Sequence, residues 1–427
     1  MIAFSGCRKQ DSNSSNGPES GKTLDQLVIA SNFNWATTRD VTISISAKDN
    51  LDNPVPGVRF TLYTANPDSG GIYLVSGITG TDGLWNSVAS LPSSMNSVTV
   101  FNNFLGLIRQ MELPITSNSI TGQFDGKPAA TVVNKSLEGG EVIKTSSTTK
   151  WVYMSTYNYQ GVPDNILPVN EPVSQQLMTD INAALPAYKN EVAYHPEWFA
   201  STVPNNLDIL SVSDVFITYI TEGAGWMNAL GYFVFNTSQP SASASAIDTI
   251  HIIFPNVSNT GSGGGLNPGN KIYLGKFPAG KSIGFVSVPH GWNGISVYVG
   301  PSSDVWYSIS AFNTTDPLML KHLLLFNDPS RQQILFTLED QGKYQGSDQD
   351  CNDNVFYVTI SPSMQGVNTT NMPVLATTVV DSDHDGVPDA SDDYPNDPTK
   401  AFNNYTPSKT GYSSLGFEYK REIQLFC

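Results

Sequence analysis

Residues 334–358 read ILFTLEDQGKYQGSDQDCNDNVFYV, and this stretch decides the fold class. It begins with an apolar run at 334–338 and ends with another at 355–358. Both runs are short and rich in β-branched and aromatic residues, which favours β-strands. The segment between them is acidic and contains glycine. We therefore expect one strand to lead into a loop and another to leave it, so that the loop gathers its polar side chains around one point.

The acidic loop predicts a calcium site. A hard divalent cation prefers six to eight oxygen ligands, and carboxylates and amides supply them. Cys351 lies among these residues but is too soft to be a ligand for such an ion. The alternative is a solvated acidic loop without an ion. The candidate ligands are Glu339, Asp340, Asp348, Asp350, Asn352 and Asp353.

Similar strand patterns extend through most of the chain. Between residues 24 and 130 the strands alternate apolar and polar positions, so each buries one face. Pro56-Gly57-Val58 and the Thr81-Asp82-Gly83 turn are similar to those of Ig-like and carboxypeptidase-regulatory-like domains. Between 207 and 363 several strands are apolar at nearly every position. Such strands are covered on both faces, which favours a sandwich.

These patterns predict an all-β protein with an Ig-like sandwich, a larger β-sandwich, one helix between them and a C-terminal calcium loop. Leu177, Ile181 and Leu185 recur at helical spacing before Pro186, which predicts the helix at 174–185. The expected organisation is a tether (1–23), the Ig-like sandwich (24–130), a linker and helical lead-in (131–206), the second sandwich (207–363), the calcium loop (376–400) and a C-terminal segment (401–427).

Composition narrows the possible partners. The 427 residues carry a net charge of −16, and only 14% of them are charged. Without a basic stripe to neutralise phosphates, nucleic acid is excluded as a partner, and direct binding to anionic lipid is disfavoured. No apolar run reaches the roughly 20 residues that span a bilayer.

Residues 381–392, DSDHDGVPDASD, form a second calcium motif. Oxygen donors recur at calcium-loop spacing, and Gly386 stands at position six, where the backbone must turn sharply. Pro388 and the absence of flanking helical patterns argue against a helix-loop-helix unit, and the loop resembles a thrombospondin type 3 repeat. The alternative is a solvated acidic linker. The candidate ligands are Asp381, Asp383, Asp385, the carbonyl of Val387, Asp389 and Asp392.

Cys7 follows Ala3-Phe4-Ser5-Gly6 and precedes a polar tether. This string resembles a bacterial lipobox, in which cleavage makes the cysteine an acylated N-terminus. Six preceding residues are too few for a signal peptide, so we expect translation to start upstream of Met1. The alternative is an incidental cysteine in a tail.

An aromatic stripe occupies the odd positions Trp151, Tyr153, Tyr157 and Tyr159. If this stripe is exposed, its rings and that of Trp292 would stack on sugar rings, which predicts glycan contact. Buried, the stripe packs one sheet on its neighbour, the commoner arrangement for aromatic residues in strands.

Catalysis and nucleotide binding receive little support. Residues 275–282, GKFPAGKS, match the phosphate-loop string, but that chemistry needs a helix where residues 283–288 predict a strand. The histidines lack metal-ligand spacing. A glycoside hydrolase would need two carboxylates across a cleft, for which Glu197 and Glu222 are available. We expect no nucleotide and no enzymatic activity.

A family resemblance covers roughly residues 174–405. Its motifs are EGAGW at 222–226, LGY at 230–232, LNPG at 266–269, GWN at 291–293, FND at 326–328 and the two halves of the acidic loop. They follow one another as in a bacterial β domain of unknown function that occurs in LruC-domain-containing surface lipoproteins. Gly416-Phe417-Glu418 resembles the opening of the LruC domain, which the remaining residues do not continue. We expect that domain to be truncated here.

The resemblance implies an exported, calcium-supported envelope protein. We expect an outer-membrane lipoprotein that faces outward, is held to the membrane only by its lipid anchor, and serves adhesion or surface structure. Its partners would be glycans or other surface proteins. The alternatives are a glycan-binding module of a polysaccharide-capture system and a secreted glycoside hydrolase.

Overall fold

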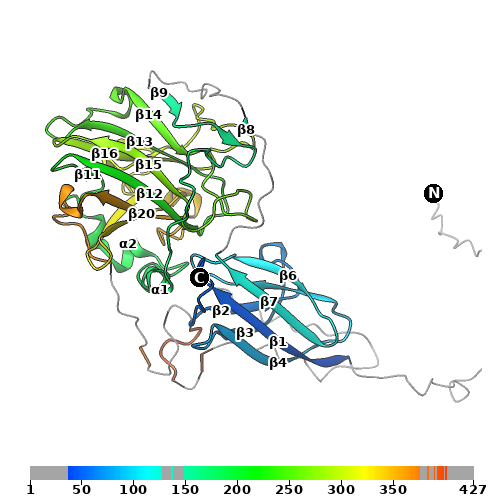
Figure 1. Cartoon of the computed structure of the whole chain (residues 1–427). Coiled ribbons are helices and arrows are strands. Elements are labelled where there is room, and N and C mark those ends of the chain that lie inside the picture. Colours follow the sequence, from blue (N-terminus) through cyan, green and yellow to red (C-terminus); the bar gives the residue numbers. More distant parts are fainter. Residues whose placement is uncertain are drawn as a thin grey trace, which may run out of the picture.

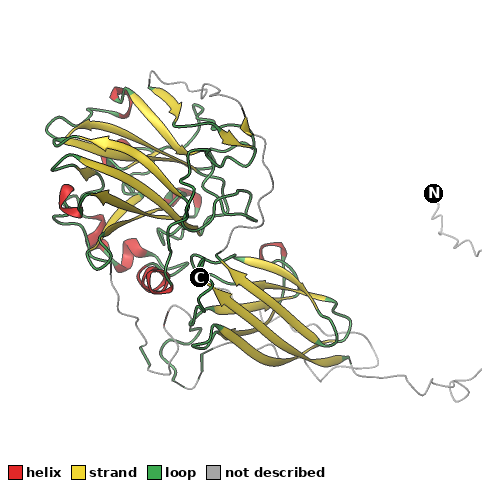
Figure 2. Ribbon diagram, in the orientation of Figure 1, coloured by secondary structure: helices red, strands yellow, loops and turns green. Residues whose placement is uncertain are grey.

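The protein is nearly all β, as the sequence predicts (Figures 1 and 2). The computed structural model describes residues 37–126, 136–137, 149–375, 382–383, 389, 392–398 and 400–401. Two β-sandwiches follow one another along the chain, and a helix lies beside their junction. The predicted fold class is confirmed.

The first sandwich packs a three-stranded sheet on a four-stranded one. The first sheet has the order β4 (Leu84–Pro92), β1 (Thr38–Lys48), β7 (Ser119–Asp125). The second has the order β3 (Tyr73–Ile78), β2 (Arg59–Tyr63), β5 (Ser97–Phe101), β6 (Gln110–Pro114). Phe60 and Phe124 meet between the sheets with ring centroids 4.7 Å apart. The predicted alternation is confirmed in β1, where Val41, Ile43 and Ile45 are fully buried.

The second sandwich is larger. One sheet has the order β11 (Leu207–Asp208), β16 (Lys281–Val288), β13 (Ala229–Asn236), β14 (Thr249–Phe254), β9 (Lys150–Tyr153), with β17 (Trp306–Tyr307) also paired to β16. The other has the order β15 (Lys271–Phe277), β12 (Ser213–Glu222), β20 (Asn354–Ser361), β19 (Gln333–Leu338), β18 (Leu323–Asp328). Strand β9 pairs in parallel with β14, so this sheet takes an edge strand from upstream of residue 207. A short pair, β8 (Ser136–Leu137) and β10 (Tyr157–Asn158), lies nearby.

Stacked phenylalanines fill the space between these two sheets. The ring of Phe336 lies 4.5 Å from that of Phe285 and 5.5 Å from that of Phe356, measured between centroids. Phe356 in turn stacks on Phe254 at 5.8 Å. Offset stacks of this kind add about 0.5–1.5 kcal/mol per pair to the burial of the rings.

The outer face of the five-stranded sheet is also covered. Helix α1 (Gln175–Ala184) begins at Ser174, whose hydroxyl accepts a hydrogen bond from the N–H of Leu177. Leu177 and Ile181 join one apolar cluster with Phe326 and Tyr357 of the sheet, and this cluster continues into the first sandwich. The predicted helix and the two-sided burial of these strands are both confirmed, because α1 and the first sandwich cover the second face.

Candidate metal centre

The acidic loop connects β19 to β20, which are antiparallel neighbours in the five-stranded sheet. Leu338 pairs with Asn354, so the residues that leave one strand lie beside those that enter the next. Gln349 and Cys351 adopt left-handed backbone conformations, with φ of 62° and 56°, and the loop turns sharply there. The expected gathering of acidic side chains at this sheet edge is thereby observed.

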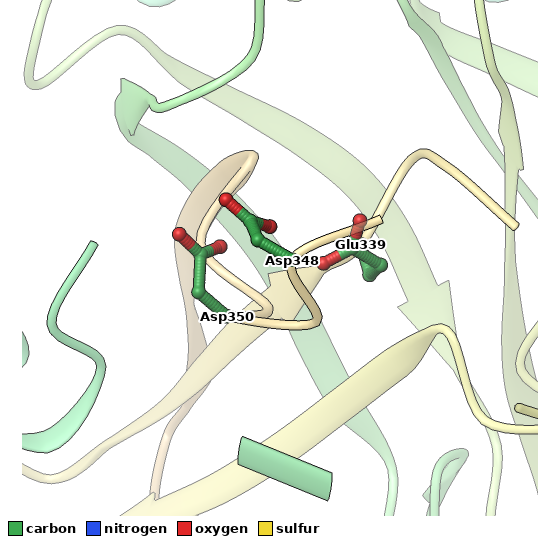
Figure 3. A group of neighbouring side chains, drawn as sticks. All are labelled: Glu339, Asp348 and Asp350. Carbon is green, nitrogen blue, oxygen red and sulfur yellow. The ribbon is translucent and has the colours of Figure 1, made fainter. Parts of the chain in front are cut away.

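Two overlapping groups of carboxylates converge. Single oxygen atoms of Glu339, Asp348 and Asp350 lie within 4.8 Å of one another, and so do oxygens of Glu339, Asp340 and Asp353. Figure 3 shows the first three side chains grouped on the loop. Since Glu339 belongs to both groups, all five carboxylates surround one small region.

Three of these five carboxylates are largely removed from water. Glu339, Asp340 and Asp350 expose 1%, 2% and 4% of their surface. Burial, reinforced by the charges of Asp350 and Asp348, raises the pKa of Glu339 to about 8. Burial likewise raises the pKa of Asp350 to about 7 and that of Asp340 to about 6. The ionised cluster is therefore unfavourable without a compensating charge.

The protein itself supplies little of that charge. Within the described ranges, no Lys, Arg or His nitrogen forms an ion pair with any of the five carboxylates. The contacts are neutral donors instead. Asp340 accepts from the Asn228 amide at 2.7 Å, and Asp353 accepts from the backbone N–H of Asp340 at 2.6 Å. These bonds fix orientations and leave other carboxylate oxygens available to a ligand.

A hard divalent cation fits this arrangement. The candidate ligands are all oxygens, which suits calcium or magnesium rather than a softer metal. A cavity of about 40 Å³ adjoins the loop and is lined by Asp348, Asp350, Asn352 and Asp353 among others. The Cys351 side chain turns away into the apolar cluster beside α1.

Several residues that lie around the acidic loop could not be identified from the sequence. Tyr188 donates its backbone N–H to Asp350 at 2.8 Å, and Asn228 reaches Asp340 from before β13. Glu191, at the start of α2 (Glu191–Tyr194), is fully buried and accepts no hydrogen bond from the described part of the chain. Burial raises the pKa of Glu191 to about 7.

The C-terminal calcium motif is only partly described. Asp381, Asp385 and Val387 lie outside the described residues, as does Cys7. Asp389 accepts hydrogen bonds from the backbone and hydroxyl of Ser382 at 2.7 and 2.6 Å. The ligand set that includes Asp383 and Asp392 stays a prediction.

The structure corrects the prediction of glycan contact by the aromatic stripe. Trp151, Tyr157 and Trp292 expose only 6%, 4% and 2% of their surface, because they pack in one apolar cluster on the outer face of the six-stranded sheet. Tyr153 is half-buried, and its hydroxyl accepts the N–H of Val297 at 2.9 Å. Tyr159 alone is exposed. The stripe packs within the protein, as the alternative prediction has it.

The phosphate-loop string lies where the chain crosses from one sheet of the second sandwich to the other. Residues 271–277 and 281–288 are strands β15 and β16, and Gly280 turns between them with φ of 79°. The predicted strand after the string is confirmed. Of the two carboxylates considered for hydrolysis, Glu222 lines two cavities and Glu197 lines neither.

Two family models match parts of the chain, and both describe domains of unknown function. DUF8469 matches residues 39–124, which is the first sandwich, and DUF4114 matches residues 277–361, which include the acidic loop. A search of curated proteins finds no match. Among the described residues, no helix is long and apolar enough to cross a membrane.

Solved structures give faint similarities. The shaft pilin SpaA from Lactobacillus rhamnosus GG is 11% identical over 59% of this chain and 87% of that chain, with a TM-score of 0.16. A 9R-lipoxygenase from Cyanothece PCC8801 is 9% identical over 63% of this chain and 42% of that chain, with a TM-score of 0.17. Scores this low do not indicate a shared fold.

Proposed function

We propose that the chain is an exported, calcium-stabilised lipoprotein of the cell envelope with an adhesive or structural role at the surface. The observation that carries this proposal is the convergence of five carboxylates at one end of the β19–β20 pair, with none of which a Lys, Arg or His of the described residues forms an ion pair. A bound calcium ion would offset part of their charge and fix the β19–β20 loop, with Glu339, Asp340, Asp348, Asp350 and Asp353 as its ligands.

Calcium dependence supports an extracellular location. Extracellular calcium modules bind with dissociation constants of roughly 10⁻⁴–10⁻³ M, matched to the calcium available outside the cell. The lipobox-like string that ends at Cys7 and the resemblance to surface lipoproteins point to the same compartment. The anchor and the outward orientation are part of the proposal.

A structural role suits the position of the site. The acidic loop contacts Tyr188, and a neighbouring cavity is lined jointly by the loop and by residues 102–105 of the first sandwich. An ion there would stiffen the junction between the sandwiches, which is useful to a protein that must keep its shape outside the cell.

Thermal unfolding with calcium and with EDTA tests calcium stabilisation. We expect a lower melting temperature in EDTA, since ligands that bind only the folded state stabilise it. Protease treatment of intact producing cells tests the location, and we expect cleavage without lysis. Equal melting in both buffers would refute calcium stabilisation, and protection until lysis would refute surface exposure.

A further inference from the structure

A cavity of about 460 Å³ lies between the two sandwiches, away from the aromatic stripe. This volume is within the range of ligand pockets, roughly 300–1,000 Å³, and domain junctions are a common place for them. Its polar lining comes from both sides: Arg109, Gln110 and Asp125 from the first sandwich, and Glu222, Asn259 and Ser262 from the second.

The walls of this cavity are held in place by the chain itself. The Arg109 guanidinium donates to the carbonyl of Gly223 at 2.6 Å, across the junction. The Asn50 amide donates to the carbonyls of Glu171 and Pro268 at 3.1 and 3.2 Å. A pocket with fixed walls loses less entropy when it binds a ligand.

Among the residues that line this cavity, Glu222 has the most hydrogen-bond acceptor positions without a donor. It exposes 6% of its surface, and neither carboxylate oxygen accepts a hydrogen bond from the described part of the chain. Burial raises its pKa to about 7, although hydrogen-bond donors of Ser262, Asn259 and Ser258 close to the carboxylate oppose the shift. A buried acceptor without a partner is costly, so a ligand that donates hydrogen bonds here gains free energy.

The charged residues in the lining of the cavity indicate which class of ligand fits it. One guanidinium faces two carboxylates, those of Asp125 and Glu222, so the wall lacks the dense negative charge of the calcium centre. Carboxylate, amide, guanidinium and hydroxyl groups together offer both donors and acceptors. Leu107, Leu266 and Pro268 add apolar surface. Alternating hydroxyls and C–H groups, as on a sugar, match such a lining.

We infer that this cavity binds a short neutral oligosaccharide, with Glu222 as the acceptor that anchors its hydroxyls. The loop at 258–265 supplies Asn259 and Ser262 to the site. Gly261 and Gly263 take left-handed φ values of 90° and 86°, which lets the loop fold back along the cavity. Glu222 also lines the small cavity beside the acidic loop, but the inference itself does not depend on calcium stabilisation.

Calorimetric titration of the full chain, in calcium, tests the inference. The probes are neutral trisaccharides with glucose, mannose, galactose or xylose units, an acidic galacturonic acid trimer and the polyamine spermidine. We expect a neutral trisaccharide to bind and Glu222→Gln to weaken that binding at least about tenfold, because the variant loses the stronger hydrogen bonds that a carboxylate accepts.

Further variants keep the result interpretable. Glu112→Gln removes an exposed carboxylate of the first sandwich outside the cavity and serves as the control. Gln110→Ala and Ser262→Ala alter exposed residues on opposite walls, so weaker binding in both supports the site even if Glu222→Gln fails to fold. The inference is overturned if no neutral trisaccharide binds, if only the acidic trimer or the polyamine binds, or if binding is unchanged in both wall variants.

Discussion

The Asp350 carboxylate accepts a hydrogen bond of 2.8 Å from the backbone N–H of Tyr188, although 162 residues separate them. The hydroxyl of Tyr188 accepts in turn from the Arg109 guanidinium at 3.3 Å. This chain of contacts links the acidic loop of the second sandwich to strand β6 and its preceding loop in the first. An ion that orders the loop therefore also orders the junction.

Replacing Arg109 by alanine is expected to destabilise the protein by about 1–3 kcal/mol. The change removes the bonds to Gly223 and Tyr188 and the contact of the guanidinium with the Phe101 ring, at 5.2 Å from its centroid. Urea unfolding measures the loss. The control is Lys276→Ala, which removes an exposed ion pair and should cost less than about 1 kcal/mol. Equal losses would contradict the role of Arg109 at the junction.

Gly223 and Gly225 form a matched pair for testing the packing of the acidic loop. A Cβ at Gly223 would lie 2.4 Å from Asn352 Oδ1 and 3.0 Å from its carbonyl oxygen, whereas a Cβ at Gly225 meets nothing within 4 Å. We expect Gly223→Ala to destabilise the protein by about 1–3 kcal/mol and to weaken calcium binding. Gly225→Ala should match the wild type in both. Calcium titration and unfolding compare them, and similar behaviour of the two variants would be evidence against close packing here.

Local patterns were sufficient to predict most of the fold. The apolar runs at 334–338 and 355–358 marked β19 and β20, residues 283–288 marked β16, and the helical spacing within 174–185 marked the helix. The acidic loop was predictable because its two strands adjoin in sequence and pair directly. Strand β15 was missed because its sequence, KIYLGKF, lacks a continuous apolar run and overlaps the phosphate-loop string.

Contacts between distant segments were not predictable. Tyr188 and Asn228 reach the acidic loop only because the sheet order and the path of the chain after α1 bring them there. Alternation along Trp151 to Tyr159 shows that aromatic side chains share a face but not whether another layer covers it. In the structure, Trp292 and its neighbours provide that cover.

The stability of the calcium-free protein should fall as pH rises. Folding raises the pKa of Glu339 from 4.5 to about 8, and those of Asp350 and Asp340 from 3.8 to about 7 and about 6. The folded chain thus binds more protons than the unfolded chain between about pH 4 and pH 8, and this contribution is lost across that window. Each extra proton gives a slope of up to about 1.4 kcal/mol per pH unit.

Unfolding in EDTA between pH 6.5 and 8 measures this effect, to which Glu191 and Glu222, with pKa values raised to about 7, add in the same direction. His322, whose pKa burial lowers from 6.5 to about 4, acts in the opposite direction but only below about pH 6.5. Glu339→Gln should flatten the slope, and saturating calcium should do the same because it stabilises the ionised carboxylates. A calcium-free protein that gains stability over this range would show that the carboxylates are not buried together.

Phe356→Ala tests the core of the second sandwich. Its ring stacks on Phe254 and Phe336, and it is fully buried between the sheets. Loss of the ring should cost about 3–5 kcal/mol in chemical unfolding. Val88→Ala, at an exposed position of β4, should change stability by less than about 0.5 kcal/mol. A small effect of Phe356→Ala would mean that the two sheets do not pack as described.

Calorimetric titration of calcium at pH 7 is the most direct test of the metal centre. It compares the full wild-type chain, the double variant Glu339→Gln with Asp353→Asn, and the surface control Glu112→Gln. The wild type and the control should show the same binding events, and the double variant should lose one event together with part of its calcium-dependent rise in melting temperature. Identical isotherms for all three proteins would contradict a calcium ion bound by the acidic loop.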